Sequence, residues 1–224
     1  MTSIIVPTLN EETTIERSLA ALIQLEGEKE IIVVDGGSSD RTNALALPFG
    51  TRLLNAERGR GPQMHAGALA AVGEVLWFVH ADTVPPACAL TEILRSLADP
   101  TVAGGSFSLV FDGPSRAARQ LTVVYPLLRL LSLSYGDAGI FVRRSAYQAS
   151  GGFRRQPLFE DIDLIRRLKL HGRFVRLDCA LTTSSRRFEN SNFAGVWANW
   201  IFLQVLYWFG VPPARLARWY RHVR

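Results

Sequence analysis

A carboxylate and an imidazole stand at the end of an apolar segment, where they could bind a divalent metal. The apolar run Val75–Val79 predicts a strand buried on both faces, and the strand stops at His80-Ala81-Asp82. Ligands of these types would then face the crevice in which open α/β sheets bind their substrates. Taken alone, the segment is explained equally well by Asp82 capping a helix that begins near Pro86.

Further polar clusters favour the ligand site over the helix cap. Each of them stands at the end of a predicted strand, in an adjoining turn or at the start of a helix. They are Pro7-Thr8-Leu9-Asn10-Glu11, Asp35–Asp40 and Glu160-Asp161. Because the carboxyl ends of parallel strands line one crevice, we expect these clusters to lie together with Asp82.

A basic, glycine-containing loop, Glu57–Pro62, leads into a predicted helix. Its glycines would let the backbone approach a phosphate, and the amino end of the following helix favours an anion. A solvated turn is the more frequent explanation for such a loop, so the loop adds little by itself.

The elements that must position these clusters alternate between strand and helix. In the first half, apolar runs predict strands at Ser3–Val6, Glu30–Val34, Thr51–Asn55 and Val75–Val79. One helix is predicted after Asn10, which can cap it. A second is predicted over Gln63–Val72, and a third after Pro85-Pro86. This order predicts an α/β fold with a mostly parallel sheet and helices on both faces.

The second half has a different character. Gly105–Phe111 predicts an edge or antiparallel strand, Ala138–Val142 and Arg173–Leu177 predict short strands, and Glu160–His171 predicts a helix ended by Gly172. No linker separates this half from the first. We therefore expect one domain over residues 1–190 and an apolar helical tail over residues 191–224.

Composition and the positions of the cysteines limit the class of protein to which the chain can belong. The chain has 224 residues and a net charge of +5, and its basic residues are nearly all arginines, most of which we expect on a solvated surface. Cys88 and Cys179 stand in no metal-binding or redox spacing and suit a reducing compartment. The amino terminus lacks the pattern of a signal peptide, so we expect a cytoplasmic location. Neither GxGxxG nor GxxxxGK[ST] occurs.

Six segments together resemble a known family. SIIVPTLNEE, IIVVDGGSSD, LWFVHADT, GDAGIFVRRSAY, GGF and PLFEDIDLIRRL are similar, in this order, to the inverting family-2 glycosyltransferases of the GT-A fold. The resemblance runs from residue 3 to about residue 190. It is strongest to a short bacterial subgroup with HADT in place of the usual DxD, and more distant to the carotenoid (diaponeurosporenoate-type) glycosyltransferases. It implies a GT-A, Rossmann-like sheet.

The resemblance also implies which residues hold a nucleotide-diphosphate sugar, with a uracil-type base as the first expectation. Asp35 would accept a hydrogen bond from the base, and Arg58 would lie near the diphosphate. Asp137 matches a loop that faces the acceptor cleft, although an Asp that shapes a turn is an equal alternative. Arg187 matches a position near the diphosphate or acceptor, with a surface salt bridge as its alternative. The remaining donor-binding positions are Pro7, Thr8, Asn10, Glu11, Gly36, Gly37 and His80.

The chemistry that the resemblance implies needs a metal and a base. Asp82 matches the last residue of the metal-binding DxD motif and would hold Mg²⁺ or Mn²⁺ against the diphosphate, and His80 would ligate the metal, contact the diphosphate or only pack. Asp161, flanked by Glu160, matches the presumed general base that takes the proton of the acceptor hydroxyl. Asp163 lies two positions further along the helix, so we expect it to be structural.

The tail is rich in aromatic residues and ends in arginines. Residues 190–214 carry no charge, and Arg215, Arg218, Arg221 and Arg224 follow. This pattern suits a helix in a membrane interface beside anionic lipid, on the inner face of the cell membrane. Packing on the domain or on the partner of a homodimer is an equal alternative. No recognition motif accompanies the arginines, so we predict no nucleic-acid partner.

We therefore predict an inverting glycosyltransferase that moves a sugar from a nucleotide-diphosphate sugar to a hydroxyl of a small-molecule or lipid acceptor. One alternative is a sugar-1-phosphate nucleotidyltransferase, but that class needs a basic, glycine-rich loop directly after the first strand. The other is a non-catalytic module that binds nucleotide sugars.

Overall fold

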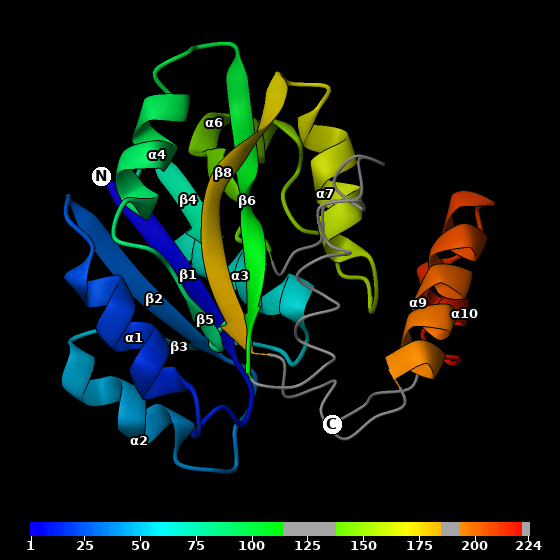
Figure 1. Ribbon diagram of the computed structural model, residues 1–224, viewed down its shortest axis with the longest axis horizontal. Helices are drawn as coiled ribbons and strands as arrows, with labels where there is room; N and C mark the ends of the chain where they lie inside the picture. The colour runs from blue at the N-terminus through cyan, green and yellow to red at the C-terminus, as the bar shows by residue number, and fades with distance from the viewer. Residues whose placement is uncertain (114–137, 185–192, 221–224) are drawn as a thin grey trace.

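The computed structural model describes residues 1–113, 138–184 and 193–220, and one eight-stranded sheet organises it (Figure 1). The strand order is β3-β2-β1-β4-β7-β6-β8-β5. The strands are β1 (Thr2–Thr8), β2 (Lys29–Asp35), β3 (Arg52–Asn55), β4 (Val75–Phe78), β5 (Thr83–Val84), β6 (Val102–Asp112), β7 (Phe141–Arg143) and β8 (Arg173–Ser184).

The first four strands in this order form the parallel half of the sheet. β1 pairs in parallel with β2 and β4, and β2 pairs in parallel with β3. The register places Thr8 opposite Asp35 and Ile5 opposite Phe78, so the carboxyl ends of β1, β2 and β4 are neighbours. All four strands predicted in this half are confirmed.

The other half of the sheet is mixed. β7 pairs antiparallel with both β4 and β6, β6 pairs in parallel with β8, and the short β5 pairs antiparallel with β8. The sequence predicts an edge or an antiparallel strand at Gly105–Phe111. β6 is antiparallel to β7 only at Gly104 and Gly105, it runs parallel to β8 along its length, and it is not at the edge of the sheet. β8 extends to Ser184 and covers β6, which therefore lies inside the sheet.

Helices cover both faces. They are α1 (Ile15–Gln24), α2 (Thr42–Ala46), the 3₁₀ turn η1 (Leu47–Phe49), α3 (Arg60–Ala70), α4 (Ala89–Ser96), α6 (Arg144–Ala149), α7 (Glu160–Leu168), α9 (Phe193–Trp208) and α10 (Pro213–Leu216). One core cluster joins α1 and α4 to the sheet, and the other joins α3, α6 and α7 to its opposite face. Adjacent residues of β1 divide between them, Ile4 and Val6 facing the first and Ile5 the second, which explains why these strands are apolar throughout.

The predicted helix cap at Asn10 is wrong, and the alternative of a cap at Asp82 is not observed either. α1 begins at Ile15 after Thr14, because Asn10 adopts a left-handed conformation (φ 54°) and its side chain bonds to another loop. Asp82 lies just before β5, and Cys88 is the residue that precedes α4. The explanation of Asp82 as a helix cap is thereby excluded.

The C-terminal helices pack beside the start of α7 (Figure 1). Leu203 of α9 and Leu216 of α10 form a third apolar cluster with Phe159, and the Phe159 and Tyr207 rings stack with centroids 4.7 Å apart. Within the described ranges, no helix is long and apolar enough to cross a membrane. The predicted boundary at residues 190 and 191 lies outside the described residues.

Candidate active site

Asp35 organises the loop that follows β2. This buried carboxylate accepts hydrogen bonds from the backbone N–H groups of Gly37 and Ser38, at 3.0 and 2.9 Å, and from the side chains of Ser38, Asn43 and Thr8. Burial alone would raise its pKa, but the hydrogen bonds from Ser38, Asn43 and Gly37 outweigh burial and lower it. Asp35 is therefore an ionised group that holds the turn in place.

The loops after β1 and β2 are bound to each other. Asn10 donates its N–H to the Ser38 hydroxyl at 2.9 Å and accepts the N–H of Ser39 at 2.9 Å. The N–H of Glu11 donates to the hydroxyl of Thr42 at 2.7 Å. The predicted residues Thr8, Asn10 and Glu11 thus form one rim with the Asp35 loop, and this rim begins at Pro7 within β1.

Asp40 strengthens the same junction. It accepts hydrogen bonds from the N–H and the hydroxyl of Thr42, and from the N–H of Glu12 at 3.2 Å. Its slight burial acts to raise its pKa, but the hydrogen bonds from Thr42 and Glu12 outweigh that effect and lower it. Glu12 in turn pairs with the exposed Arg41.

Gln63 is a positioning residue that sequence reasoning missed. This buried amide of α3 donates to the carbonyl oxygens of Thr8 at 2.7 Å and Val34 at 2.8 Å, and it accepts the N–H of Gly59 at 3.3 Å. It therefore ties the ends of β1 and β2 to the basic loop. The sequence feature that could have indicated this role is a glutamine among small residues at the start of a predicted helix.

Close packing against Gln63 also explains Gly36. A Cβ at Gly36 would lie 2.9 Å from the Gln63 Oε1 atom, so the space left by the absent side chain is filled by this amide. Gly37 differs, because it is exposed, has a φ of 92° and has nothing within 4 Å of its Cβ position. Of the two glycines, Gly37 is the one that leaves room beside the rim.

The basic loop lies against the start of α7. A Cβ at Gly61 would lie 2.9 Å from the Arg154 carbonyl oxygen and 3.5 Å from Glu160 Cβ. Glu57 of the loop forms an ion pair with Arg155, and Arg58 is exposed. The loop that was predicted to face the diphosphate is therefore next to the predicted catalytic pair.

Asp82 and His80 follow β4 in a turn closed by the Thr83 N–H and the His80 carbonyl oxygen, 3.1 Å apart. Both side chains are half-buried, and the Thr83 hydroxyl approaches an Asp82 carboxylate oxygen at 3.5 Å. β1 separates β4 from β2, so the two strands that lead to Asp82 and Asp35 lie roughly 10 Å apart across the sheet at the usual spacing of neighbouring strands.

A divalent cation fits the turn that carries His80 and Asp82 only if a bound substrate supplies some of its ligands. No group of three or more His, Cys, Asp and Glu residues among the described parts of the chain could hold a metal by itself. Mg²⁺ and ions like it are commonly held by one or two carboxylates together with substrate phosphates and water. The half-buried carboxylate of Asp82 fits a site of that kind, in which a diphosphate supplies the other oxygens.

Glu160 and Asp161 are the first residues of α7, and the residue before them has a strained backbone conformation. The preceding Phe159 is buried and has a φ of 62° and a ψ of 24°, a conformation that bulky residues rarely adopt and that costs about 1 kcal/mol or more. Glu160 is buried and Asp161 is half-buried. The stacking of Phe159 on Tyr207 holds this bend beneath the carboxylates.

Asp163 forms ion pairs with two arginines. Its carboxylate is 2.6 Å from Arg167 and 3.6 Å from Arg154. This arrangement agrees with the structural role predicted for it. Asp137 and Arg187, two further predicted site residues, lie outside the described residues.

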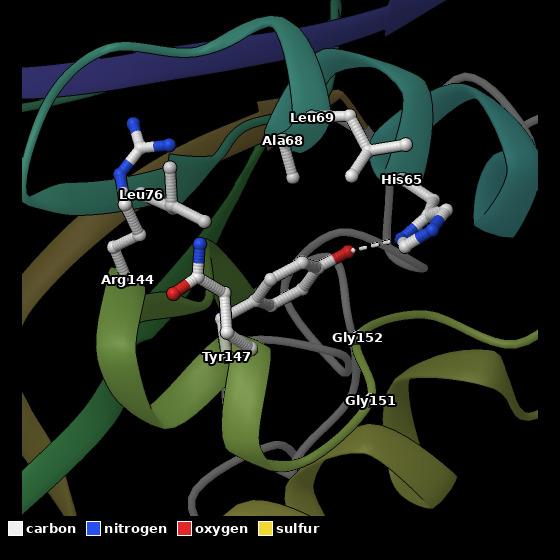
Figure 2. Close-up of a pocket in the computed structure, with 9 residues that line it drawn as sticks. His65, Ala68, Leu69, Leu76, Arg144, Tyr147, Gly151 and Gly152 are labelled. Carbon is white, nitrogen blue, oxygen red and sulfur yellow. Dashed lines mark hydrogen bonds between the residues drawn. The ribbon is translucent and has the colours of Figure 1, made fainter.

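A separate cavity of about 280 Å³ lies between α3 and α6 (Figure 2). His65, Arg144 and Tyr147 line it, together with apolar side chains, and none of the predicted site residues does. Tyr147 bonds to His65 Nδ1 at 2.9 Å, and burial lowers the pKa of His65. We regard this cavity as part of the packing between the two helices.

Sequence comparison defines the class of protein. The chain belongs to glycosyl transferase family 2, whose sequence model matches residues 3–162. A similar relative is the probable glycosyltransferase YdaM of Bacillus subtilis (strain 168), which is 26% identical over 207 residues. The alignment covers 81% of this chain and 49% of YdaM, so the chain spans about half the length of that relative.

Solved structures show the same fold. The mannosyltransferase PcManGT from Pyrobaculum calidifontis, in complex with GDP-Man and Mn²⁺, aligns with a TM-score of 0.70 and 21% identity over 91% of this chain and 62% of its own. S. aureus TarS in complex with UDP-GlcNAc aligns with a TM-score of 0.67 and 19% identity over 86% of this chain and 60% of its own. The predicted GT-A fold is thereby confirmed.

Proposed function

We propose that this protein transfers a sugar from a nucleotide-diphosphate sugar to a hydroxyl acceptor with inversion at the anomeric carbon. One observation supports this proposal above the others: Asp35 and Asp82 stand at the ends of β2 and β4, on either side of β1. The roughly 10 Å between these two strands across the sheet suits a nucleoside beside one strand and its diphosphate beside the other. Family membership and the two donor-bound neighbours lend further support.

The rim of the first two loops would bind the nucleoside. Both oxygens of the ionised Asp35 already accept hydrogen bonds from surrounding residues, so the carboxylate would accept a base N–H in place of one of these partners, and the exposed Gly37 leaves space beside it. Asn10 and Glu11 hold the opposite side of this rim. A uracil-type base has an N–H group that fits a carboxylate acceptor. The UDP-GlcNAc bound to TarS supports a uracil-type base by analogy, whereas PcManGT binds a guanine nucleotide.

The diphosphate would lie between Arg58 and Asp82. Arg58 is exposed on a loop that is hydrogen-bonded to Gln63 and carries the surface ion pair Glu57–Arg155. Asp82 would hold Mg²⁺ or Mn²⁺, with His80 beside it, and a bound cation would neutralise the departing nucleoside diphosphate. The Mn²⁺ in PcManGT supports this choice by analogy.

Asp161 would accept the proton of the acceptor hydroxyl as that oxygen attacks the anomeric carbon. A single displacement needs one base and one leaving group. Glu160 precedes Asp161, is buried, and lies close to Gly61 of the basic loop, and it would help to position the start of α7.

The acceptor would be a lipid, or a small molecule delivered at a membrane surface. Phe202 and Trp208 of α9, Phe209 directly after α9 and Trp219 after α10 are more than half exposed, and Arg215 and Arg218 of the same segment are exposed too. Aromatic side chains beside arginines suit an interface with anionic lipid. The inner faces of the same helices pack on Phe159, directly before Glu160 and Asp161.

The transfer is tested by release of nucleoside diphosphate from a panel of UDP- and GDP-sugars with Mn²⁺. We expect release from at least one donor by the full chain, and loss of release in Asp82→Ala. Asp178→Ala, at an exposed carboxylate of β8, is the matched control. No release from any donor, or full activity in Asp82→Ala, contradicts the proposal. Pyrophosphate release from a nucleoside triphosphate and a sugar-1-phosphate would identify a nucleotidyltransferase, and donor binding without turnover would identify a binding module.

Membrane binding is tested separately by sedimentation with vesicles. We expect binding to vesicles that contain anionic phosphatidylglycerol and little binding to neutral ones. Phe209→Ser with Trp219→Ser should lower the bound fraction, and equal binding of this double variant contradicts the interface. Dimers in solution that the same double variant dissociates would assign this face to a partner subunit instead.

A further inference from the structure

Cys88 and Cys179 are brought together by the fold, although 91 positions separate them in the sequence. Their Sγ atoms lie 2.9 Å apart, and both are free thiols. Cys88 directly precedes α4, and Cys179 belongs to β8. Sequence spacing gave no indication of this pair.

We propose that Cys88 and Cys179 are a modification site that forms a reversible disulfide in response to thiol oxidants. A disulfide needs its two sulfur atoms about 2 Å apart, so the gap closes with a shift of about 1 Å. Helix α4 and strand β8 pack against each other, which keeps the two cysteines side by side.

The two thiols have different surroundings, which assigns their order of reaction. Cys88 is exposed and meets an oxidant first, whereas Cys179 is half-buried against the core cluster of the α1 and α4 face. Burial, the neighbouring Cys88 and the charge of Glu92 raise the pKa of Cys179 to about 12. Cys179 is therefore the less reactive thiol toward an oxidant in solution, and its position 2.9 Å from the Cys88 sulfur is what would let it resolve an adduct formed there.

The reaction with a low-molecular-weight disulfide such as oxidised glutathione is balanced as follows. The thiolate of Cys88 attacks one glutathione sulfur, which forms a mixed disulfide and releases the first glutathione thiolate. Cys179 loses its proton to water and attacks the Cys88 sulfur, which forms the Cys88–Cys179 bond and releases the second glutathione. Two protein thiols are oxidised, and one glutathione disulfide is reduced to two thiols.

The bond would clamp the segment that follows Asp82. β5 begins one residue after Asp82 and pairs Thr83 with Thr183 of β8, and Thr83 also accepts a hydrogen bond from Ser18 at 2.9 Å. A covalent link between Cys88 and β8 adds to this pairing. In a reducing compartment the link would form only when the thiol pool becomes oxidised.

The site is tested on the full chain with oxidised glutathione, followed by alkylation with N-ethylmaleimide and non-reducing tryptic mapping. We expect a cross-link between peptides 61–95 and 177–186, no alkylation of either cysteine, and a Tm several degrees higher that falls back after reduction. Two stable glutathione adducts, two alkylated thiols or a cross-linked dimer contradicts the proposal.

Single variants test the order of reaction. Cys179→Ser should retain a stable glutathione adduct on Cys88, and Cys88→Ser should form an adduct on Cys179 at least about tenfold more slowly. Equal rates overturn the assignment of Cys88 as the first thiol. Since the wild-type chain is mapped directly, a variant that failed to fold would not remove the test of the bond. The test needs no sugar donor, so its outcome is independent of the proposed transfer activity.

Discussion

Gln63 donates a hydrogen bond from its side-chain amide to the carbonyl oxygen of Thr8 at 2.7 Å. The same nitrogen reaches Val34 at 2.8 Å, and the amide oxygen accepts from Gly59. One buried side chain thus joins the ends of two parallel strands to the basic loop. The nucleoside rim and the diphosphate loop are held in register by this residue, although it contacts neither ligand in our account.

Gln63→Glu tests this positioning role with a side chain of the same shape. A carboxylate would place an oxygen against the two carbonyl oxygens that the amide nitrogen now serves, so we expect a loss of about 3 kcal/mol in the free energy of unfolding. Urea denaturation measures this loss. Gln148→Glu, on the exposed surface of α6, is the control and should unfold as the wild type does. Equal stability of Gln63→Glu and Gln148→Glu contradicts the role.

Asp35→Asn should weaken both the rim and the binding of the donor. The substitution turns one acceptor oxygen into a donor that faces the N–H groups or hydroxyls now bound there, which costs about 2 kcal/mol. We expect donor affinity, measured by calorimetry, to fall at least about tenfold, which corresponds to a loss of at least about 1.4 kcal/mol in binding free energy. Asp178→Asn should bind the donor as the wild type does, and unchanged affinity in Asp35→Asn would remove the base-binding role.

Asp82→Asn should abolish the stimulation of donor turnover by Mn²⁺. The neutral amide is a poorer ligand for a hard cation, so we expect turnover at saturating metal to fall by about 100-fold or more. The measurement is nucleotide release across a titration of Mn²⁺. A curve that coincides with that of the wild type would show that Asp82 holds no metal.

Acid should destabilise the fold through His65. Burial lowers the pKa of His65, whose Nδ1 atom forms a hydrogen bond with the Tyr147 hydroxyl at 2.9 Å. The unfolded chain therefore binds a proton more readily than the folded one, and stability declines as pH falls from about 6.5 toward the lower pKa of the folded state. His65→Asn keeps an acceptor but cannot titrate, so its Tm should change less over this range. A decline as steep as in the wild type would exclude His65 as the cause.

The parallel half of the fold could be predicted because its strands are buried on both faces and read as short apolar runs. The start of α1 could not, because the side chain of Asn10 binds Ser39 of a loop distant in sequence. β6 lies inside the sheet because β8 is long enough to pair along it. The alternation of apolar and polar residues within β6 does not reveal the length of β8. Gln63 escaped prediction because its partners are backbone carbonyl groups on other strands. The Cys88–Cys179 contact was not predicted because the two cysteines are far apart in the sequence.

The central claim is that Asp161 acts on the acceptor while the donor is held elsewhere. The most direct measurement compares donor binding and donor turnover in Asp161→Asn, with Mn²⁺ present throughout. We predict donor affinity within about twofold of the wild type and nucleotide release lower by about 100-fold or more. Release at the wild-type rate in Asp161→Asn, or loss of donor binding together with activity, would contradict the account.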